Sequence, residues 1–234
     1  MQAKDLSKIL RDLGDPAIAE HSQRFFKTGK GEYGEGDNFL GIRVPVLRAQ
    51  AKKHRAISLE QVEKLLHSRF HEERLCALLL LVLKFEKAGS VEKTTIYKLY
   101  MQNTQFINNW DLVDSSAHYI IGAYLENRSR QPLYKLAKSK SLWERRIAIM
   151  STFHFIRNNQ FDDTLKISRQ LLNDNEDLIH KAVGWMLREV GNRAVTIEKE
   201  FLKAHYKAMP RTMLRYAIEK FPERERKKFL SGSV

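Results

Sequence analysis

Apolar residues recur along most of this chain at intervals of three and four positions, the spacing that places side chains on one face of an α-helix. The segment 59–66 shows the pattern clearly, with apolar residues at positions 59, 62, 65 and 66. No convincing segment alternates apolar and polar residues as a half-buried strand does, and no Asn-Gly or Asp-Gly pair marks a hairpin turn. The pattern therefore predicts an all-α fold.

Proline and glycine, of which the chain has only 5 and 11, stand mostly where the helical spacing stops. Such residues commonly begin or end helices. Ser58 and Gln61 have the spacing of a capping box, which closes the first turn of a helix. The expected helices lie near residues 3–13, 16–28, 45–55, 59–67, 71–88, 91–102, 110–126, 131–139, 142–158, 161–173, 176–190, 195–207, 210–220 and 222–230.

From residue 58 onward, shorter and longer helices alternate with a unit of roughly 35–40 residues, a period typical of helical repeats. The longer helices are apolar on most sides, as in LCALLLLVLKF and RIAIMSTFHFI, so other helices must cover them. Stacked helix pairs provide that cover, because each layer buries its neighbour. We therefore expect a single domain over residues 1–234, with HEAT-like repeats stacked into a curved α-α superhelix. An irregular all-α bundle is the alternative.

The charge of the chain narrows the class of partner. Its 41 Lys and Arg residues exceed its 28 Asp and Glu residues, which gives a net charge of +13. Such a field favours a polyanion, through phosphate neutralisation and counterion release. The basic residues are dispersed along the chain, which indicates a folded basic surface and not a disordered arm. Nucleic acid is the favoured partner, with acidic proteins and anionic lipid as alternatives.

Cysteine usage and hydropathy indicate the compartment. The single cysteine, Cys76, excludes a disulfide framework and points to a reducing environment; we interpret it as a small buried apolar residue. The first ten residues lack the apolar stretch of a signal peptide. The longest apolar run, Cys76–Leu83, is far shorter than the roughly 20 residues of a membrane span. We expect a soluble, cytoplasmic monomer.

The segment Lys27–Phe39 contains Gly29-x-Gly31-x-x-Gly34, formally a dinucleotide-binding motif. Its context is wrong, because a helix precedes it and no βαβ unit surrounds it. We interpret it as a flexible loop between helices, close to the ligand.

Two histidines four positions apart, His67 and His71, are followed by Glu72 and Glu73, a spacing that can place metal ligands on one helix face. The chain has no HExxH motif, no cysteine pair and no third ligand at a suitable spacing. We therefore interpret both histidines as exposed or capping residues at a helix junction, and expect neither a metal nor a cofactor. The chain also has no GxSxG motif, so the sequence does not indicate a serine nucleophile.

The segment NNWDLVD places Trp110 and Asp114 four residues apart, on one face of a helix. Asp111 follows Trp110, where an acidic side chain suits the first helical turn. Taken alone, this segment describes a core tryptophan and a surface acid.

Four segments in order resemble the AlkD family of alkylpurine DNA glycosylases, and the resemblance is strongest between residues 108 and 191. They are FLGIRVPVLR (39–48), NNWDLVDSSAHYIIG (108–122), LWERRIAIM (142–150) and HKAVGWMLREVG (180–191). The resemblance implies a superhelix whose concave basic face holds double-stranded DNA. It also implies monofunctional excision of N3- and N7-alkylated purines, with the lesion left stacked so that bulky adducts are tolerated.

The resemblance also implies roles for individual residues. Asp114 matches the family's catalytic acid, and Trp110 and Trp185 match its cleft tryptophans. Arg146 matches its cleft arginine, and Phe25 is the nearest match to an N-terminal site aromatic that is a tyrosine in the family. Three further arginines of these segments are expected contacts to DNA: Arg43, Arg145 and Arg188.

Chemistry agrees with these residue types. An N3- or N7-alkylated purine is cationic and leaves readily, so the main requirement is a carboxylate, Asp114, that stabilises the oxocarbenium-like sugar and directs water to it. The tryptophan faces would hold the cation, a contact worth roughly 0.5–2 kcal/mol. Since no lysine is indicated as a Schiff-base nucleophile, we expect no lyase step. A non-catalytic HEAT-like DNA-binding protein that recognises DNA shape is the main alternative, and a protein-interaction scaffold is a second.

Overall fold

The computed structural model describes residues 1–234 and divides into two compact units, Met1–Ser116 (unit 1) and Ala117–Val234 (unit 2). Both units consist of helices and the turns between them, and the only β-type pairing is an isolated bridge between Asn38 and Phe70. The predicted all-α class is thus confirmed, whereas the single domain stays a prediction. None of the helices combines the length and apolar character needed to cross a membrane.

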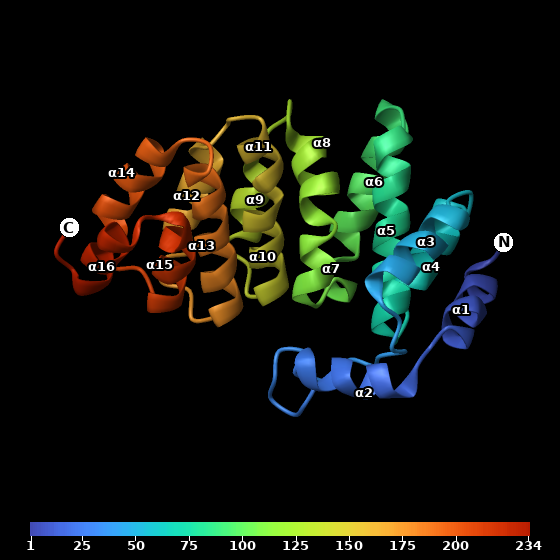
Figure 1. Ribbon diagram of the computed structural model, residues 1–234. Coiled ribbons are helices and arrows are strands. Elements are labelled where there is room, and N and C mark those ends of the chain that lie inside the picture. Colours follow the sequence, from blue (N-terminus) through green and yellow to red (C-terminus); the bar gives the residue numbers. More distant parts are fainter. The chain divides into compact units, whose positions relative to one another are not determined.

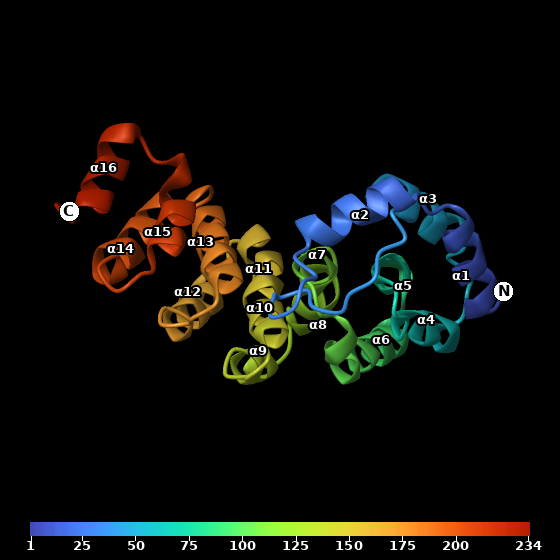
Figure 2. The ribbon, with the colours of Figure 1, turned by 90° about the horizontal axis from the view of Figure 1, so that it is seen from below.

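Unit 1 is organised around one long helix, α5 (His71–Lys87), as Figure 1 shows. This helix contacts α1, α3, α4, α6 and α7. The element α2 runs crosswise below the ends of the other helices of unit 1 in Figure 1, and Figure 2 views it from that side. The remaining elements of the unit are α1 (Ala3–Asp12), α2 (Pro16–Phe25), α3 (Val44–Lys53), α4 (Leu59–Leu66), α6 (Ser90–Gln102), η1 (Thr104–Phe106) and α7 (Trp110–Asp114).

The central place of α5 follows from its composition. Every residue from Leu75 to Leu81 is 5% exposed or less, so no side of this stretch faces solvent. Burying one leucine side chain contributes about 1.5–3 kcal/mol, and the run therefore requires helices all around it. Cys76 lies within the run and is completely buried, as predicted.

Unit 2 has a similar centre in α13 (Asp177–Gly191), which packs against α10, α12, α14 and α15. Its other elements are a π-helical turn η2 (His118–Gly122), α8 (Ala123–Leu125), α9 (Gln131–Leu136), α10 (Leu142–Ser151), α11 (Phe153–Arg157), α12 (Asp162–Gln170), α14 (Val195–His205), α15 (Arg211–Ala217), η3 (Ile218–Lys220) and α16 (Glu223–Ser231).

The expected helices are confirmed to within a few residues except at two places, where one continuous helix was predicted and a broken one is found. The helix expected at 110–126 ends at Asp114, and the one expected at 142–158 is interrupted at Thr152. At both breaks, Ser or Thr hydroxyls donate to carbonyls three or four residues earlier: Ser116 to Leu112 at 2.6 Å and Thr152 to Ile149 at 2.7 Å. Such bonds compete with the helical ladder and bend the chain.

The predicted capping box at Ser58 is wrong. The Ser58 side chain makes no capping hydrogen bond. The Gln61 Oε1 atom instead accepts a hydrogen bond from the backbone N–H of Ala3, at 2.9 Å. A long-range contact to the start of α1 has thus replaced the local one.

The packing of α13 against α15 gives a prediction for Gly184. A Cβ atom at this position would lie 2.4 Å from the Met213 carbonyl oxygen and 2.5 Å from the Tyr216 Cβ atom. Since neither a carbonyl oxygen nor a Cβ atom can move without its backbone, Gly184→Ala should lower the free energy of unfolding by about 1–3 kcal/mol, the usual cost of overpacking. Denaturant unfolding measures this change. Gly89→Ala is the control, because a Cβ atom there meets nothing within 4 Å; equal losses in the two variants would contradict the packing argument.

Candidate functional site

Four consecutive charged residues open α5, and all four are buried. His71, Glu72, Glu73 and Arg74 are exposed by only 2–4%. The expectation that His71 is an exposed or capping histidine is therefore wrong. Because a buried charge without a partner costs several kcal/mol, each of these side chains must be paired.

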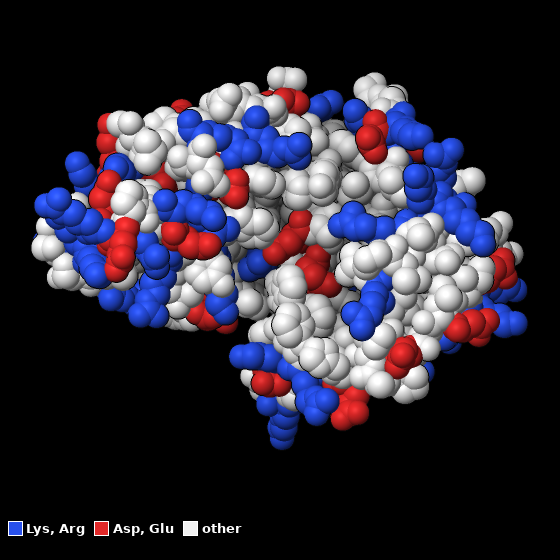
Figure 3. Space-filling model, viewed as in Figure 1, with Lys and Arg blue, Asp and Glu red and all other residues white.

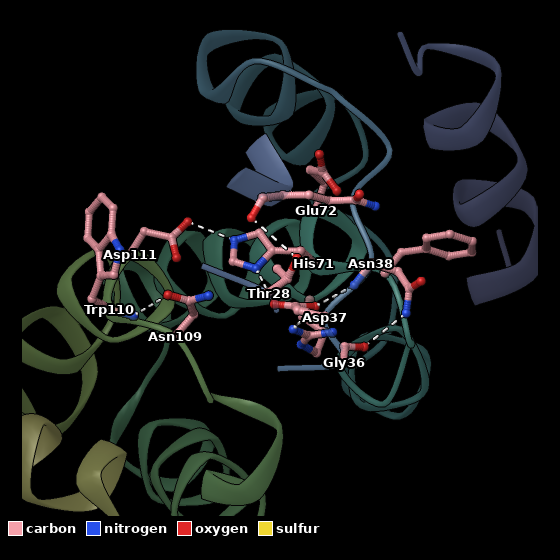
Figure 4. A network of polar contacts seen from close by, with 12 residues as sticks. Thr28, Gly36, Asp37, Asn38, His71, Glu72, Asn109, Trp110 and Asp111 are labelled. Carbon is pink, nitrogen blue, oxygen red and sulfur yellow. Dashed lines mark hydrogen bonds and ion pairs between the residues drawn. The ribbon is translucent and has the colours of Figure 1, made fainter. Parts of the chain in front are cut away.

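His71 lies between two carboxylates, as Figure 4 shows. Its Nδ1 atom is 2.8 Å from Asp37 Oδ2, and its Nε2 atom is 2.8 Å from Asp111 Oδ2. Burial alone would lower the pKa of His71, but the Asp111 and Asp37 carboxylates raise it to about 9. The ring is thus an imidazolium at neutral pH, and both of its N–H groups donate.

Asp37 comes from the glycine-rich segment that was expected to be a flexible loop. Its side chain is 3% exposed, and its Oδ1 atom accepts a hydrogen bond from Arg74 Nη2 at 2.8 Å. Burial raises the pKa of Asp37, but His71 and Arg74 outweigh it and hold that pKa below its ordinary value. The end of this segment is therefore fixed to α5 by two charged partners, and the expectation of flexibility is wrong there.

Glu72 fixes the chain that follows the glycine-rich segment. Its carboxylate accepts three backbone N–H groups, from Leu40 at 2.8 Å, Gly41 at 2.7 Å and Ile42 at 3.2 Å. Gly41 has a φ of +81°, and a Cβ atom there would lie 2.0 Å from the Asp15 carbonyl oxygen. Only glycine fits this turn, and the turn brings the three N–H groups to one carboxylate.

Glu73 binds in the opposite direction, toward α1. Its Oε1 atom accepts from Ser7 Oγ at 2.5 Å and from Arg11 Nε at 3.0 Å, and its Oε2 atom accepts from Ser68 Oγ at 2.6 Å. The first turn of α5 thereby holds α1, the glycine-rich segment and α7 through charged side chains. We call residues 71–74 with Asp37 and Asp111 the buried charge cluster.

An aromatic stack connects this cluster with Trp110. The ring of Phe39 stacks on His71 with centroids 4.4 Å apart, and Phe26 stacks on Phe39 at 4.9 Å. Phe26 also stacks on Trp110 at 5.2 Å, with an interplanar angle of 18°. Phe25 is 57% exposed and contacts Trp110 with its edge, at 6.1 Å. Phe25 is thus close to Trp110, while Phe26 supports the indole ring.

The short helix α7 begins with Trp110 and ends with Asp114, so the two side chains lie one turn apart on the same face. Both residues are partly exposed. Asn109 caps the helix, because its Oδ1 atom accepts the Trp110 N–H at 2.8 Å. Burial and the nearby Asp114 carboxylate raise the pKa of Tyr100. An aromatic ring and a carboxylate are therefore one turn apart on one helix, an arrangement that can attract a cation.

The predicted residues of unit 2 lie on α10 and α13. Arg146 is 4% exposed, and its Nη1 atom donates to the Leu178 carbonyl at 2.5 Å. Arg145 is bound to Asp174, with Nε 2.6 Å from Oδ2. Both side chains therefore have contacts within the protein, and their contacts to DNA stay predictions.

The two predicted residues of α13, Trp185 and Arg188, also have contacts within the protein. Trp185 is half-buried, and its Nε1 atom donates to Glu189 Oε1 at 3.3 Å. Its ring lies 6.3 Å from that of Phe153. Arg188 forms an ion pair with Glu219. Their contribution to a site also stays a prediction.

Arg43 differs from these arginines, because it is exposed and has no carboxylate partner. It precedes α3, a helix without acidic residues. Four further exposed cations of this segment also lack carboxylate partners: Arg48, Lys52, Lys53 and Arg55. Figure 3 shows that Lys and Arg are spread over the visible face with acidic residues among them. The α3 segment is thus a surface with uncompensated positive charge.

The histidines do not form a metal site. His67 is exposed, and its Nε2 atom is 2.5 Å from Asn103 Oδ1, while both nitrogens of His71 are bound to carboxylates. No group of three or more His, Cys, Asp or Glu side chains is arranged to hold a metal ion.

Sequence reasoning missed the residues that support Trp110, namely Asp37, His71, Asp111, Phe26 and Phe39. The sequence indicates Asp111 only as a first-turn acid and His71 only as an exposed or capping residue. One signal was present: four charged residues directly precede the most apolar run of the chain. Charged residues that a helix carries into its buried layer require partners, although their position does not say which.

Comparison with known proteins gives one family and several similar structures. The family model described as "DNA alkylation repair enzyme" matches residues 6–221. A predicted DNA alkylation repair enzyme from Enterococcus faecalis superposes with a TM-score of 0.70 at 18% identity, over 90% of this chain and 97% of that chain. AlkD2 from Streptococcus mutans has a TM-score of 0.53 at 16% identity, over 88% and 98%. The protein smu.31 from Streptococcus mutans UA159 has a TM-score of 0.50 at 15% identity, over 92% and 95%.

A comparison with curated protein sequences gives no match. At the identities found for the three structures, their similarity shows the helical fold alone, while the family match covers most of the chain.

The role of Glu72 gives a prediction. In Glu72→Gln an amide NH₂ replaces one of the carboxylate oxygens that accept backbone N–H groups. Since hydrogen bonds to charged groups contribute about 1.5–3 kcal/mol, the free energy of unfolding should fall by about this amount. Denaturant unfolding tests it, with Glu86→Gln as the matched control, because Glu86 is exposed near the other end of the same helix. A Glu72→Gln protein as stable as the control would mean that this carboxylate does not hold the segment 40–42.

Proposed function

Because this chain belongs to the family of DNA alkylation repair enzymes, we propose that it is a monofunctional DNA glycosylase. Its role is in the repair of alkylated DNA. The reaction that we infer is hydrolysis of the N-glycosidic bond of N3- and N7-alkylated purines in double-stranded DNA. The observation that carries this proposal is α7, with Trp110 at its start and Asp114 at its end.

The proposed substrate explains why a site with so little catalytic machinery is sufficient. Alkylation at N3 or N7 gives the purine a formal positive charge, and departure of the base neutralises it. Protonation of the leaving group is therefore not required. The remaining barrier is the positive charge that develops on the sugar as the bond breaks, and a fixed anion lowers that barrier.

Asp114 is the proposed anion. In this role its carboxylate faces the developing oxocarbenium ion and orients the water that attacks the anomeric carbon. A lysine nucleophile and a lyase step are not part of the proposed mechanism. The product is an abasic site together with the free alkylated base.

Trp110 is the proposed contact to the cationic nucleotide. A positive charge over an indole face gains roughly 0.5–2 kcal/mol. Phe26 stacks on this indole and Phe25 touches it with its edge, so the ring is supported within unit 1. Trp185 is proposed for the same type of contact on the basis of the family resemblance.

The arginines are proposed to bind DNA phosphates without reading the base sequence. Arg43 is the best supported, because it is exposed and lacks a carboxylate partner. Arg146 is proposed from the resemblance, and a phosphate would have to reach a largely buried guanidinium. Arg145 and Arg188 are bound to Asp174 and Glu219, so we expect smaller contributions from them.

The role of Asp114 is tested by Asp114→Asn. The amide keeps the size of the side chain but not its charge, and removing one electrostatic partner in a catalytic site typically costs about 100-fold in rate. Release of N7-methylguanine in single-turnover reactions should therefore fall by up to about 100-fold, because this lesion is labile. The rate should fall by a larger factor for lesions that leave less readily. Affinity for uncleavable DNA should be unchanged or slightly higher.

Asp12→Asn is the control, because Asp12 is an exposed acid at the end of α1. It should behave like the parent protein. Equal rates of base release for Asp114→Asn and the parent would remove Asp114 from the mechanism. A parent protein that binds alkylated DNA without releasing any base would instead be a non-catalytic DNA-binding protein.

The role of Arg43 is tested by the salt dependence of DNA binding. Affinity should fall steeply with salt, with a slope of about −0.9 for each phosphate contacted on a double-logarithmic plot. Arg43→Ala should weaken binding to all duplex sequences alike and reduce the magnitude of the slope by about 1. Arg128→Ala removes the same charge, but the Arg128 guanidinium already contacts the Tyr124 ring and its carbonyl. The same change of slope in both variants would show that Arg43 has no particular place at the interface.

A further inference from the structure

Trp110 and the helix that it begins are connected to His71 in two independent ways. The first is polar, because His71 Nε2 binds the carboxylate of Asp111, the residue next to Trp110. The second is a stack of rings, in which Phe39 lies on His71, Phe26 on Phe39, and Trp110 on Phe26. Asp111, which follows Trp110 in the chain, and the ring of Trp110 itself are therefore both linked to a single side chain of α5.

The helix α7 needs such a connection because of its length. It has five residues, Trp110–Asp114, and a single turn of helix does not form on its own in water. The second carboxylate oxygen of Asp111 is buried and has no hydrogen-bond partner, and the same is true of Asn109 Nδ2. The bond from His71 is thus the only hydrogen bond that the Asp111 carboxylate receives.

From these contacts we propose that His71 is a positioning residue, which sets the orientation of the Trp110 ring and of α7 and so determines where Asp114 stands. The proposal rests on the proposed function for the roles of Trp110 and Asp114. His71 touches neither substrate nor reacting atoms; it acts through Asp111 and through the aromatic stack.

The contact geometry explains why histidine serves here. The two ring nitrogens point in opposite directions, one toward Asp37 of the glycine-rich segment and one toward Asp111 of α7. Only the imidazolium form donates in both directions at once. A neutral ring presents a lone pair to one carboxylate, which removes one hydrogen bond and leaves two negative charges without their shared cation.

Charged groups surround His71 from the glycine-rich segment, from α7 and from α5 itself. Asp37 comes from the glycine-rich segment and Asp111 from α7. From α5 itself, Arg74 is bound to Asp37, and the Glu72 carboxylate is bound to the backbone of 40–42. Phe26 and Phe39 are uncharged. The two carboxylates are the reason that the pKa of His71 is raised to about 9 although burial alone would lower it.

The direction of the pH effect follows. The raised pKa keeps His71 protonated in the folded protein through neutral pH. As the pH rises through about 9, the ring loses a proton, one of its two bonds breaks, and Trp110 should change its position. In Asp111→Asn only one carboxylate stabilises the imidazolium, so the same change should occur at lower pH.

A spectroscopic experiment on Trp110 tests this without an activity measurement. The full-length protein is labelled with 5-fluorotryptophan, and the ¹⁹F signals of its three tryptophans are assigned with Trp110→Phe, Trp143→Phe and Trp185→Phe variants. The Trp110 signal should shift with a midpoint near pH 9, and Asp111→Asn should lower that midpoint. A Trp110 signal that does not move between pH 6 and pH 10, or a midpoint unaffected by Asp111→Asn, would overturn the proposal.

A kinetic experiment tests the consequence for the reaction. In His71→Gln one of the two hydrogen bonds is lost, and small misplacements of catalytic groups typically cost about 10- to 100-fold in rate. Single-turnover release of N7-methylguanine should fall by about this factor, while affinity for uncleavable DNA stays nearly the same. His67→Gln is the matched control, because His67 is exposed and contacts only Asn103 and Phe106. His71→Gln with the rate of the parent would overturn the proposal.

The two experiments keep this inference separate from the proposed function. If His71→Gln does not fold, the pH titration of Trp110 in the unmodified chain decides the question. If the parent protein releases no alkylated base, the glycosylase proposal fails, while the Trp110 signal still shows whether His71 positions that ring.

Discussion

The imidazolium of His71, held between Asp37 and Asp111, is the contact on which the arrangement of unit 1 depends. Placing charges in a protein interior removes their hydration, and the loss is offset only when each charge meets its partner at hydrogen-bonding distance. Asp37 and Asp111 belong to segments far apart in sequence. Removing one partner from such a buried pair typically costs about 3–5 kcal/mol, so these segments cannot separate without a large loss of stability.

The two parts of α5 therefore have different tasks. The apolar run Leu75–Leu81 supplies burial and stability, but many arrangements of surrounding helices could cover an apolar cylinder. The charged first turn removes that freedom, because ion pairs and hydrogen bonds are directional. Glu73 holds α1, Glu72 holds the segment 40–42, and His71 holds α7. Specific geometry thus comes from the polar end of the helix and cohesion from its apolar middle.

The same distribution of charge suits the proposed reaction. A protein of net charge +13 attracts the phosphates of DNA, but a cationic base within that DNA requires the opposite, an aromatic face and a negative charge. The exposed cations on α3 and directly beside it lack carboxylate partners, whereas α7 has Trp110 at its first residue and Asp114 at its last. In the proposed function, different elements of unit 1 therefore bind the DNA backbone and stabilise the reacting sugar. His71 is also a cation, but it is paired with carboxylates inside the protein and does not face solvent.

The sequence by itself determined the all-α class, most helix positions and the pairing of Trp110 with Asp114 on one face, because helical periodicity and i, i+4 neighbours are local properties. It did not predict the two helix breaks, since serine and threonine bend a helix only where their hydroxyls donate to backbone carbonyls. Only the tertiary structure decided that His71 is buried and charged, because its partners lie 34 and 40 residues away in the chain. A buried ion pair depends on which distant segments meet at a point without water, and no local pattern of residues encodes that meeting.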